Sequence, residues 1–236
     1  MPIRVNASWT PLGSGILGSA GASNFARGFS GAPDPGAWYP IALANKLAGT
    51  DLAPADADID ASFSSAFPNW YFGTDGNTPA GQYDLMTVVL HELGHGLGFV
   101  GSASVTAFGS GSIGLSGTPV IYDRFVVNGS NQSLVNRSLF PNGSLDLGDQ
   151  LKSGNIFFNG AAASAAAGGK PRLYAPSSWQ PGSSYSHLDE DTYPAGNPNS
   201  LMTPQLDQGE AILDPGPITR GMFADMGWNR SSAAPT

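Results

Sequence analysis

The chain contains no cysteine, few charged residues and no long apolar run. Without cysteine, disulfide bonds and thiolate metal ligands are excluded. Only 12% of the 236 residues are charged while 41% are hydrophobic, which is typical of a globular chain rather than a disordered one. No stretch approaches the roughly 18 apolar residues that a membrane-spanning helix needs, so we expect no transmembrane segment. The net charge is −8, so we expect no basic surface that could bind the phosphate backbone of a nucleic acid, and therefore no nucleic-acid partner.

Glycine and proline are abundant, and they predict many turns between short elements. The strongest helix pattern begins at Asp84, a residue suited to an N-cap, and stops before Gly98. Its apolar residues cover most of the circumference, which predicts a buried helix. The expected elements are strands at Ile3–Trp9, Asp58–Ser64, Val120–Val127 and Ile156–Phe158, and helices at 38–49, 84–97 and 218–227. The alanine-rich tract 161–169 fits a short helix or a flexible loop.

The predicted helix 84–97 carries the sequence HELGH, an HExxH pattern. Residues four apart lie on one helix face, so His91 and His95 can direct imidazole nitrogens at one metal ion. Glu92 falls beside them, close enough to take a proton from a water on the metal. The chain has only three histidines and three glutamates, so a chance occurrence is rare, on the order of 10⁻³ per chain. The pattern therefore predicts a catalytic zinc with Glu92 as general base.

Two histidines leave a catalytic zinc one protein ligand short. In the short pattern HExxHxxGxxH, a glycine ends the helix and a third histidine follows three residues later. Gly98 fits this pattern, but Gly101 occupies the position of the third histidine.

The third ligand must therefore come from elsewhere in the chain. His187, in GSSYSHLDEDTYP, is the only other histidine, and choosing it leaves no histidine unexplained. The alternatives are a carboxylate, Glu190 or Asp189, with His187 as an ordinary loop residue. We favour His187.

A methionine in a turn follows His187 fifteen residues later, in NSLMTP. Asn199, Ser200 and Pro204 supply the turn residues around Met202. A lone methionine commonly packs in a core. In this place its soft, apolar thioether could instead lie beneath the metal ligands without competing for the metal.

Together, HELGHGLGF, SHLD, NSLMTP and ITRGMFADMGW resemble the leishmanolysin-type branch of the metzincin metallopeptidases, in which an insertion precedes the third histidine. ADIDASF before the helix is also similar to the matrixins. The resemblance covers roughly residues 56–100 and 183–228. It implies that His91, His95 and His187 bind zinc, that Glu92 is the base, that Met202 is the Met-turn residue and Gly98 the helix-ending glycine. Leishmanolysin itself is rich in disulfides, so this cysteine-free chain fits a bacterial relative better.

The resemblance also implies a fold and a mode of substrate binding. We expect an α+β, metzincin-like, two-lobed catalytic domain with a twisted mixed sheet, an active-site helix and a C-terminal helix. Residues 1–100 would form the N-terminal lobe and 101–236 the C-terminal lobe, with the cleft between them. An edge strand bearing Ile59, Ala61 and Phe63 would pair with an extended peptide. A buried internal strand remains the alternative for this segment.

The expected function is that of a zinc-dependent endopeptidase, acting on protein or peptide substrates as a monomer. One alternative is a surface adhesion or binding protein in which zinc is structural or absent. Glu92 argues against this, because a structural site needs no general base. Another alternative is a different zinc hydrolase with Glu190 as third ligand.

Two further expectations concern calcium and location. Acidic residues beside a glycine-rich loop (Asp75 and Asp84) or in alternation (Asp56, Asp58 and Asp60) are candidate ligands of a structural calcium ion, although neither set matches an EF-hand loop. The N-terminal sequence MPIRVNASW lacks the apolar core of a signal peptide. We nevertheless expect a secreted or extracellular protein whose export signal and pro-segment are not present in this chain.

Overall fold

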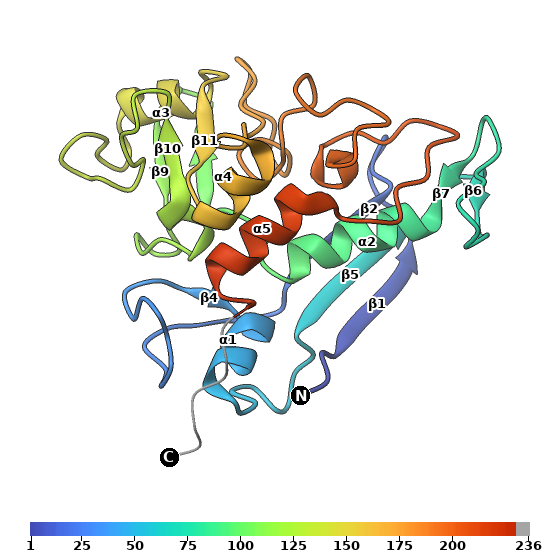
Figure 1. Cartoon of the computed structure of the whole chain (residues 1–236), viewed down its shortest axis with the longest axis horizontal. Helices are drawn as coiled ribbons and strands as arrows, with labels where there is room; N and C mark the ends of the chain where they lie inside the picture. Colours follow the sequence, from blue (N-terminus) through green and yellow to red (C-terminus); the bar gives the residue numbers. More distant parts are fainter. Residues whose placement is uncertain (230–236) are drawn as a thin grey trace.

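The computed structural model describes residues 1–229, which form a mixed α/β structure with five α-helices and several small sheets (Figure 1). A three-stranded sheet lies on one side of the long helix α2. Helix α5 and most of the second half of the chain lie on the opposite side of α2. The helices are α1 (Ile41–Ala48), α2 (Leu85–Gly96), α3 (Leu145–Leu151), α4 (Ala161–Ala167) and α5 (Gly216–Met226).

The main sheet is mixed and has the order β1-β5-β2. Its strands are β1 (Val5–Thr10), β2 (Gly18–Ala22) and β5 (Ile59–Ser64), with β1 parallel and β2 antiparallel to β5. The predicted strands at Ile3–Trp9 and Asp58–Ser64 are confirmed within two residues at each end. Strand β2 was not predicted, because its sequence GSAGA has no apolar alternation.

The structure corrects one expectation about this sheet. We expected Ile59, Ala61 and Phe63 to lie on an edge strand that binds substrate. However, β5 is hydrogen-bonded on both sides, and all three side chains are buried. A strand with two partners has no free backbone groups to offer a peptide. The edge that faces the cleft belongs to β2.

Helix α2 begins as its sequence predicts. The Asp84 carboxylate accepts the backbone N–H of Thr87, a cap that contributes about 1 kcal/mol to a helix. Gly98 follows the helix end with φ +117°, a backbone conformation that residues with a side chain rarely adopt. A Cβ at Gly96 would overlap Ile59, so this glycine lets α2 approach β5 closely. The expected burial of the helix is confirmed only in part: Val88 is buried, whereas other apolar side chains are half-buried, namely Leu85, Val89, Leu93 and Leu97.

The segment after α2 consists of short elements. They are β8 (Ala103–Val105), β9 (Gly111–Ile113), the 3₁₀ turn η1 (Tyr122–Phe125), β10 (Val126–Asn128), α3, β11 (Ile156–Phe158) and α4. The predicted strand Val120–Val127 is wrong over most of its length: η1 replaces it, and only its end joins β10. The 3₁₀ turn buries two consecutive residues, Tyr122 and Asp123, which the alternating faces of a strand would separate.

The remaining predicted elements are confirmed. The alanine-rich tract forms α4, whose first N–H groups at Ala162 and Ala163 are accepted by the Asp225 carboxylate of α5. The last predicted helix is α5, where Ile218, Met222 and Met226 are buried. The short elements not yet named are β3 (Phe25–Ala26), β4 (Tyr39–Pro40), β6 (Trp70–Tyr71), β7 (Tyr83–Asp84) and the 3₁₀ turn η2 (Ser200–Met202).

The larger hydrophobic core joins residues from both sides of residue 100, including Leu43 of α1, Phe99 and Met222 of α5. A smaller cluster lies between the main sheet and α2, around Phe63, Trp70 and Val88. The division into lobes at residue 100 therefore stays a prediction. Within residues 1–229, no helix combines the length and apolarity needed to cross a membrane.

Candidate metal centre

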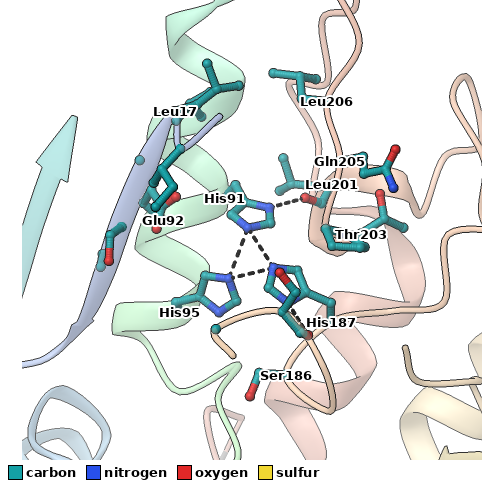
Figure 2. Close-up of a pocket in the computed structure, with 18 of the residues that line it drawn as sticks. Leu17, His91, Glu92, His95, Ser186, His187, Leu201, Thr203, Gln205 and Leu206 are labelled. Atoms are coloured by element: carbon teal, nitrogen blue, oxygen red, sulfur yellow. Dashed lines mark hydrogen bonds between the residues drawn. The ribbon is translucent and has the colours of Figure 1, made fainter. Parts of the chain in front are cut away.

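Three histidine side chains that line a cleft converge on one point (Figure 2). The Nε2 atoms of His91 and His95 are 3.0 Å apart, and each lies 3.2 Å from Nε2 of His187. His95 and His187 are buried, and His91 is half-buried. Among the described residues, these three form the group of side chains that could hold a metal ion.

Hydrogen bonds fix the protonation of each ring. The Nδ1 atoms of His91, His95 and His187 lie 2.6, 2.7 and 2.8 Å from the carbonyl oxygens of Leu201, Phe99 and Ser183. A carbonyl oxygen can only accept, so each Nδ1 carries the proton and each Nε2 presents a lone pair.

Burial supports this neutral state. Burial is the largest cause that lowers the pKa of all three rings, and the pKa of His95 falls to about 3. The neighbouring imidazoles also contribute to the lower pKa of His95 and of His187. Three lone pairs that face one another at this distance repel unless a cation lies among them. The donor set therefore fits a metal ion bound by three neutral imidazoles.

Glu92 lies on the same helix and borders the same cleft, with its side chain against β2 (Figure 2). The side chain is 5% exposed. Burial raises its pKa to about 8, an effect that the N–H of Ala20 partly offsets by donating to the carboxyl group. The close approach of β2 requires Gly18, since a Cβ there would lie 2.7 Å from Glu92 Oε1. A carboxyl group with this pKa can take and return a proton near neutral pH.

Met202 lies in the turn η2, is fully buried and packs against α2 at Gly94. A Cβ built at Gly94 would be 2.7 Å from its sulfur, so the HELGH glycine makes room for the thioether. The Met202 carbonyl accepts the N–H of Leu188, directly after His187. The turn thus supports the third histidine through its backbone, and it supports His91 through Leu201.

The structure places the competing carboxylates elsewhere. Asp189 accepts the N–H and hydroxyl of Thr192. The pKa of Glu190 is raised mainly by burial and also by the charges of Glu210 and Asp207, and the neighbouring Thr203 side chain and Gln205 backbone partly offset this shift. Neither belongs to the group that His91 and His95 form.

The candidate calcium ligands are bound by protein donors. Asp84 caps α2 and also accepts from Thr78, and Asp75 accepts from the Tyr71 hydroxyl and the Asn77 N–H. In the second set, Asp58 accepts from the Arg4 N–H and from Asn45, while Asn6 donates to Asp60. The Arg4 guanidinium also reaches the Asp56 carbonyl. Calcium binding stays a prediction without a preformed site among these residues.

The cleft has a volume of about 660 Å³ and is lined from both halves of the chain. Its lining includes the apolar side chains of Leu17, Val88 and Leu206, the rings of Tyr83 and Trp179, and the small residues 181–184. Residues 15–20, before and within β2, form one wall, although the sequence indicated only a Gly/Ser-rich stretch there. No apolar pattern could have identified this wall.

A family model described as SPBPB7E8-like matches residues 36–145, which is somewhat less than half of the chain. The matched segment includes His91, Glu92 and His95 but ends before His187 and Met202. No match was found among curated proteins or among solved structures.

Proposed function

We propose that this protein is a zinc-dependent endopeptidase of the metzincin type. The observation that carries the proposal is the convergence of three unprotonated imidazole nitrogens, 3.0–3.2 Å apart, beside a buried glutamate in an open cleft. A structural zinc site would have a fourth protein ligand and no need of a general base. The cleft and Glu92 therefore favour catalysis over the adhesion or scaffold alternative.

The ligand set favours zinc. Zinc–nitrogen bonds are about 2.0–2.1 Å long, so two nitrogens on a tetrahedral zinc are separated by roughly 3.3 Å. The observed separations are close to this value, and imidazole ligands suit zinc. Bound there, zinc supplies Lewis acidity: it lowers the pKa of a water ligand and polarises a substrate carbonyl.

Glu92 moves the proton in this proposal. Its carboxylate accepts a proton from the attacking water and later returns it to the leaving amine. The Ala20 N–H holds the carboxyl group toward β2, and the surrounding side chains exclude bulk water from it.

Substrate binding is assigned to β2 in place of β5. Leu17 O and Ser23 N bond toward the β5 side, so the intervening backbone groups of Gly18, Ala20 and Ala22 face the other edge, where the Ala20 N–H is taken by Glu92 and the other groups are left for a peptide. An extended peptide could add to this edge and run across the histidines. The cleft volume suits several side chains of such a peptide.

The leishmanolysin-type assignment rests on the order of motifs: the HELGH helix, a long intervening segment, the third histidine, the Met-containing turn and the last helix. Secretion and the monomeric state are part of the same proposal.

Metal content and peptide cleavage test it together. The wild-type chain should bind one zinc ion and cleave casein, and chelation should abolish the cleavage. His187→Ala should weaken zinc binding strongly, whereas Glu190→Ala should not. A wild type that binds zinc but cleaves no peptide would favour the structural-zinc alternative. If His187→Ala still bound zinc tightly, the assignment of His187 as the third ligand would be wrong.

A further inference from the structure

The loop that carries His187 depends on an unusual backbone conformation two residues earlier. Tyr185 has φ +74°, and it is the one bulky residue in the left-handed region among residues 1–229. Such a conformation persists only where the surroundings impose it. The direction of the following peptide determines where Ser186 and His187 point.

Several backbone contacts anchor the ends of this loop. Tyr185 N donates to Tyr174 O, Tyr174 N donates to His187 O, and Leu188 N donates to Met202 O. These bonds fix the positions of the ends, but they leave the peptide between Tyr185 and Ser186 to be oriented by its own carbonyl group.

Tyr122 supplies the partner of that carbonyl. Its hydroxyl donates to the Tyr185 carbonyl oxygen at 2.8 Å, and both tyrosines are fully buried, with ring centroids 5.8 Å apart. No water can replace this bond without entering a packed core. The bond links η1, in the long segment between His95 and His187, directly to the loop of the third ligand.

Tyr122 is itself held in place relative to the segment that follows α2. Its neighbour Asp123 accepts the N–H groups of Ser102 and Val120 at 3.0 and 2.8 Å. Ser102 follows Gly101, whose N–H donates to the Ser186 hydroxyl at 3.0 Å. The segment after the metal-binding helix, the turn η1 and the His187 loop are therefore joined by hydrogen bonds into one connected unit.

We propose that Tyr122 is a positioning residue for the third metal ligand: its hydroxyl holds the left-handed turn at Tyr185 and thereby aims Nε2 of His187 at His91 and His95. The inference rests on the proposed zinc site but concerns a different residue. It gives the long intervening segment a role, because that segment supplies the group that orients His187.

Tyr122→Phe tests the inference, since it removes one oxygen and keeps the ring. Tyr39→Phe is the matched control: Tyr39 is also fully buried and its hydroxyl accepts the N–H of Asp34, away from the His187 loop. In metal-free protein, amide exchange at Tyr185 and Leu188 should become faster in Tyr122→Phe and stay unchanged in Tyr39→Phe. Unchanged exchange in Tyr122→Phe would overturn the inference.

Zinc affinity, measured by competition with a chelator, provides the second readout. Tyr122→Phe should weaken zinc binding about tenfold, which is the lower end of the range of affinity losses for residues that orient metal ligands. Tyr39→Phe should leave zinc binding unchanged. In a His187→Ala background, Tyr122→Phe should have no further effect, because it acts through His187. A full effect in that background would show a general structural role and overturn the inference. If the wild type bound no zinc, the proposed function would fail, and the exchange experiment would still decide the role of Tyr122.

Discussion

The ring of Tyr185 packs directly on the backbone of Gly101. A Cβ at Gly101 would overlap the ring and lie 3.1 Å from Asp123 Oδ1. In the short metzincin-like pattern this position carries the third histidine. Here no side chain fits, because the position supports the loop that brings His187 into the site.

Gly101→Ala should therefore disturb the metal centre from outside it. Forcing a methyl group into this contact should cost about 1–3 kcal/mol of stability and displace the His187 loop, since buried overpacking has few ways to relax. Denaturant unfolding and zinc content measure the two effects. Gly169→Ala is the control, because a Cβ there meets nothing within 4 Å and should change stability by less than about 0.5 kcal/mol. Equal behaviour of the two variants would contradict this account of Gly101.

Met202 should act by filling space beneath the ligands. Met202→Leu keeps the volume and should cost less than about 1.5 kcal/mol with zinc retained. Met202→Ala leaves a cavity in a fully buried place and should cost about 2–5 kcal/mol. Thermal or denaturant unfolding with zinc analysis separates the variants. If a well-folded Met202→Leu lost zinc, the sulfur itself would have a role that packing does not explain.

Glu190→Gln should retain zinc and change the pH dependence of stability. Burial and nearby carboxylates raise the pKa of Glu190 above its ordinary value of 4.5. The stability contributed by the acid is therefore present below that unfolded value and is lost as pH rises through the folded pKa. Relative to the variant, the wild type should be more stable near pH 4 than near pH 8. Denaturant midpoints at both pH values would show this, and a difference that is constant with pH would argue against it.

The free edge of β2 predicts a main-chain requirement in the substrate. A peptide that pairs with this edge donates and accepts with every second residue. Single N-methyl groups placed along a cleaved peptide should therefore impair cleavage at alternate positions, and mainly through KM. Uniform tolerance of N-methylation on both sides of the cleaved bond would exclude pairing with β2.

The sequence was sufficient for the elements that have strong local signals. Asp84 and Gly98 mark the two ends of α2, because an N-cap and a positive φ are local requirements of a helix end. The apolar alternation of Ile59, Ala61 and Phe63 identified β5 as a strand. That alternation could not tell an edge strand from a central one. The neighbours of β5 are set by chain topology, and the neighbour that makes it central, β2, has almost no side chains to reveal it.

The convergence of the three histidines was predictable for a different reason. His91 and His95 are four residues apart on one helix, while His187 could be inferred only because no other histidine exists. The support of His187 could not be inferred at all. Tyr122 and Asp123 looked like part of an alternating strand, and their burial side by side in a 3₁₀ turn depends on contacts with residues far away in sequence, Tyr185 and Ser102.

Glu92→Gln, compared with the wild type, tests the central claim most directly. The substitution keeps the shape of the side chain but removes the proton acceptor, so general-base catalysis should fall by roughly 10²–10⁴-fold. The measurement is zinc stoichiometry together with kcat/KM on a peptide substrate for the two purified proteins. The account predicts one zinc per chain in both proteins and cleavage only by the wild type. Cleavage by Glu92→Gln at the wild-type rate, with zinc bound, would contradict it.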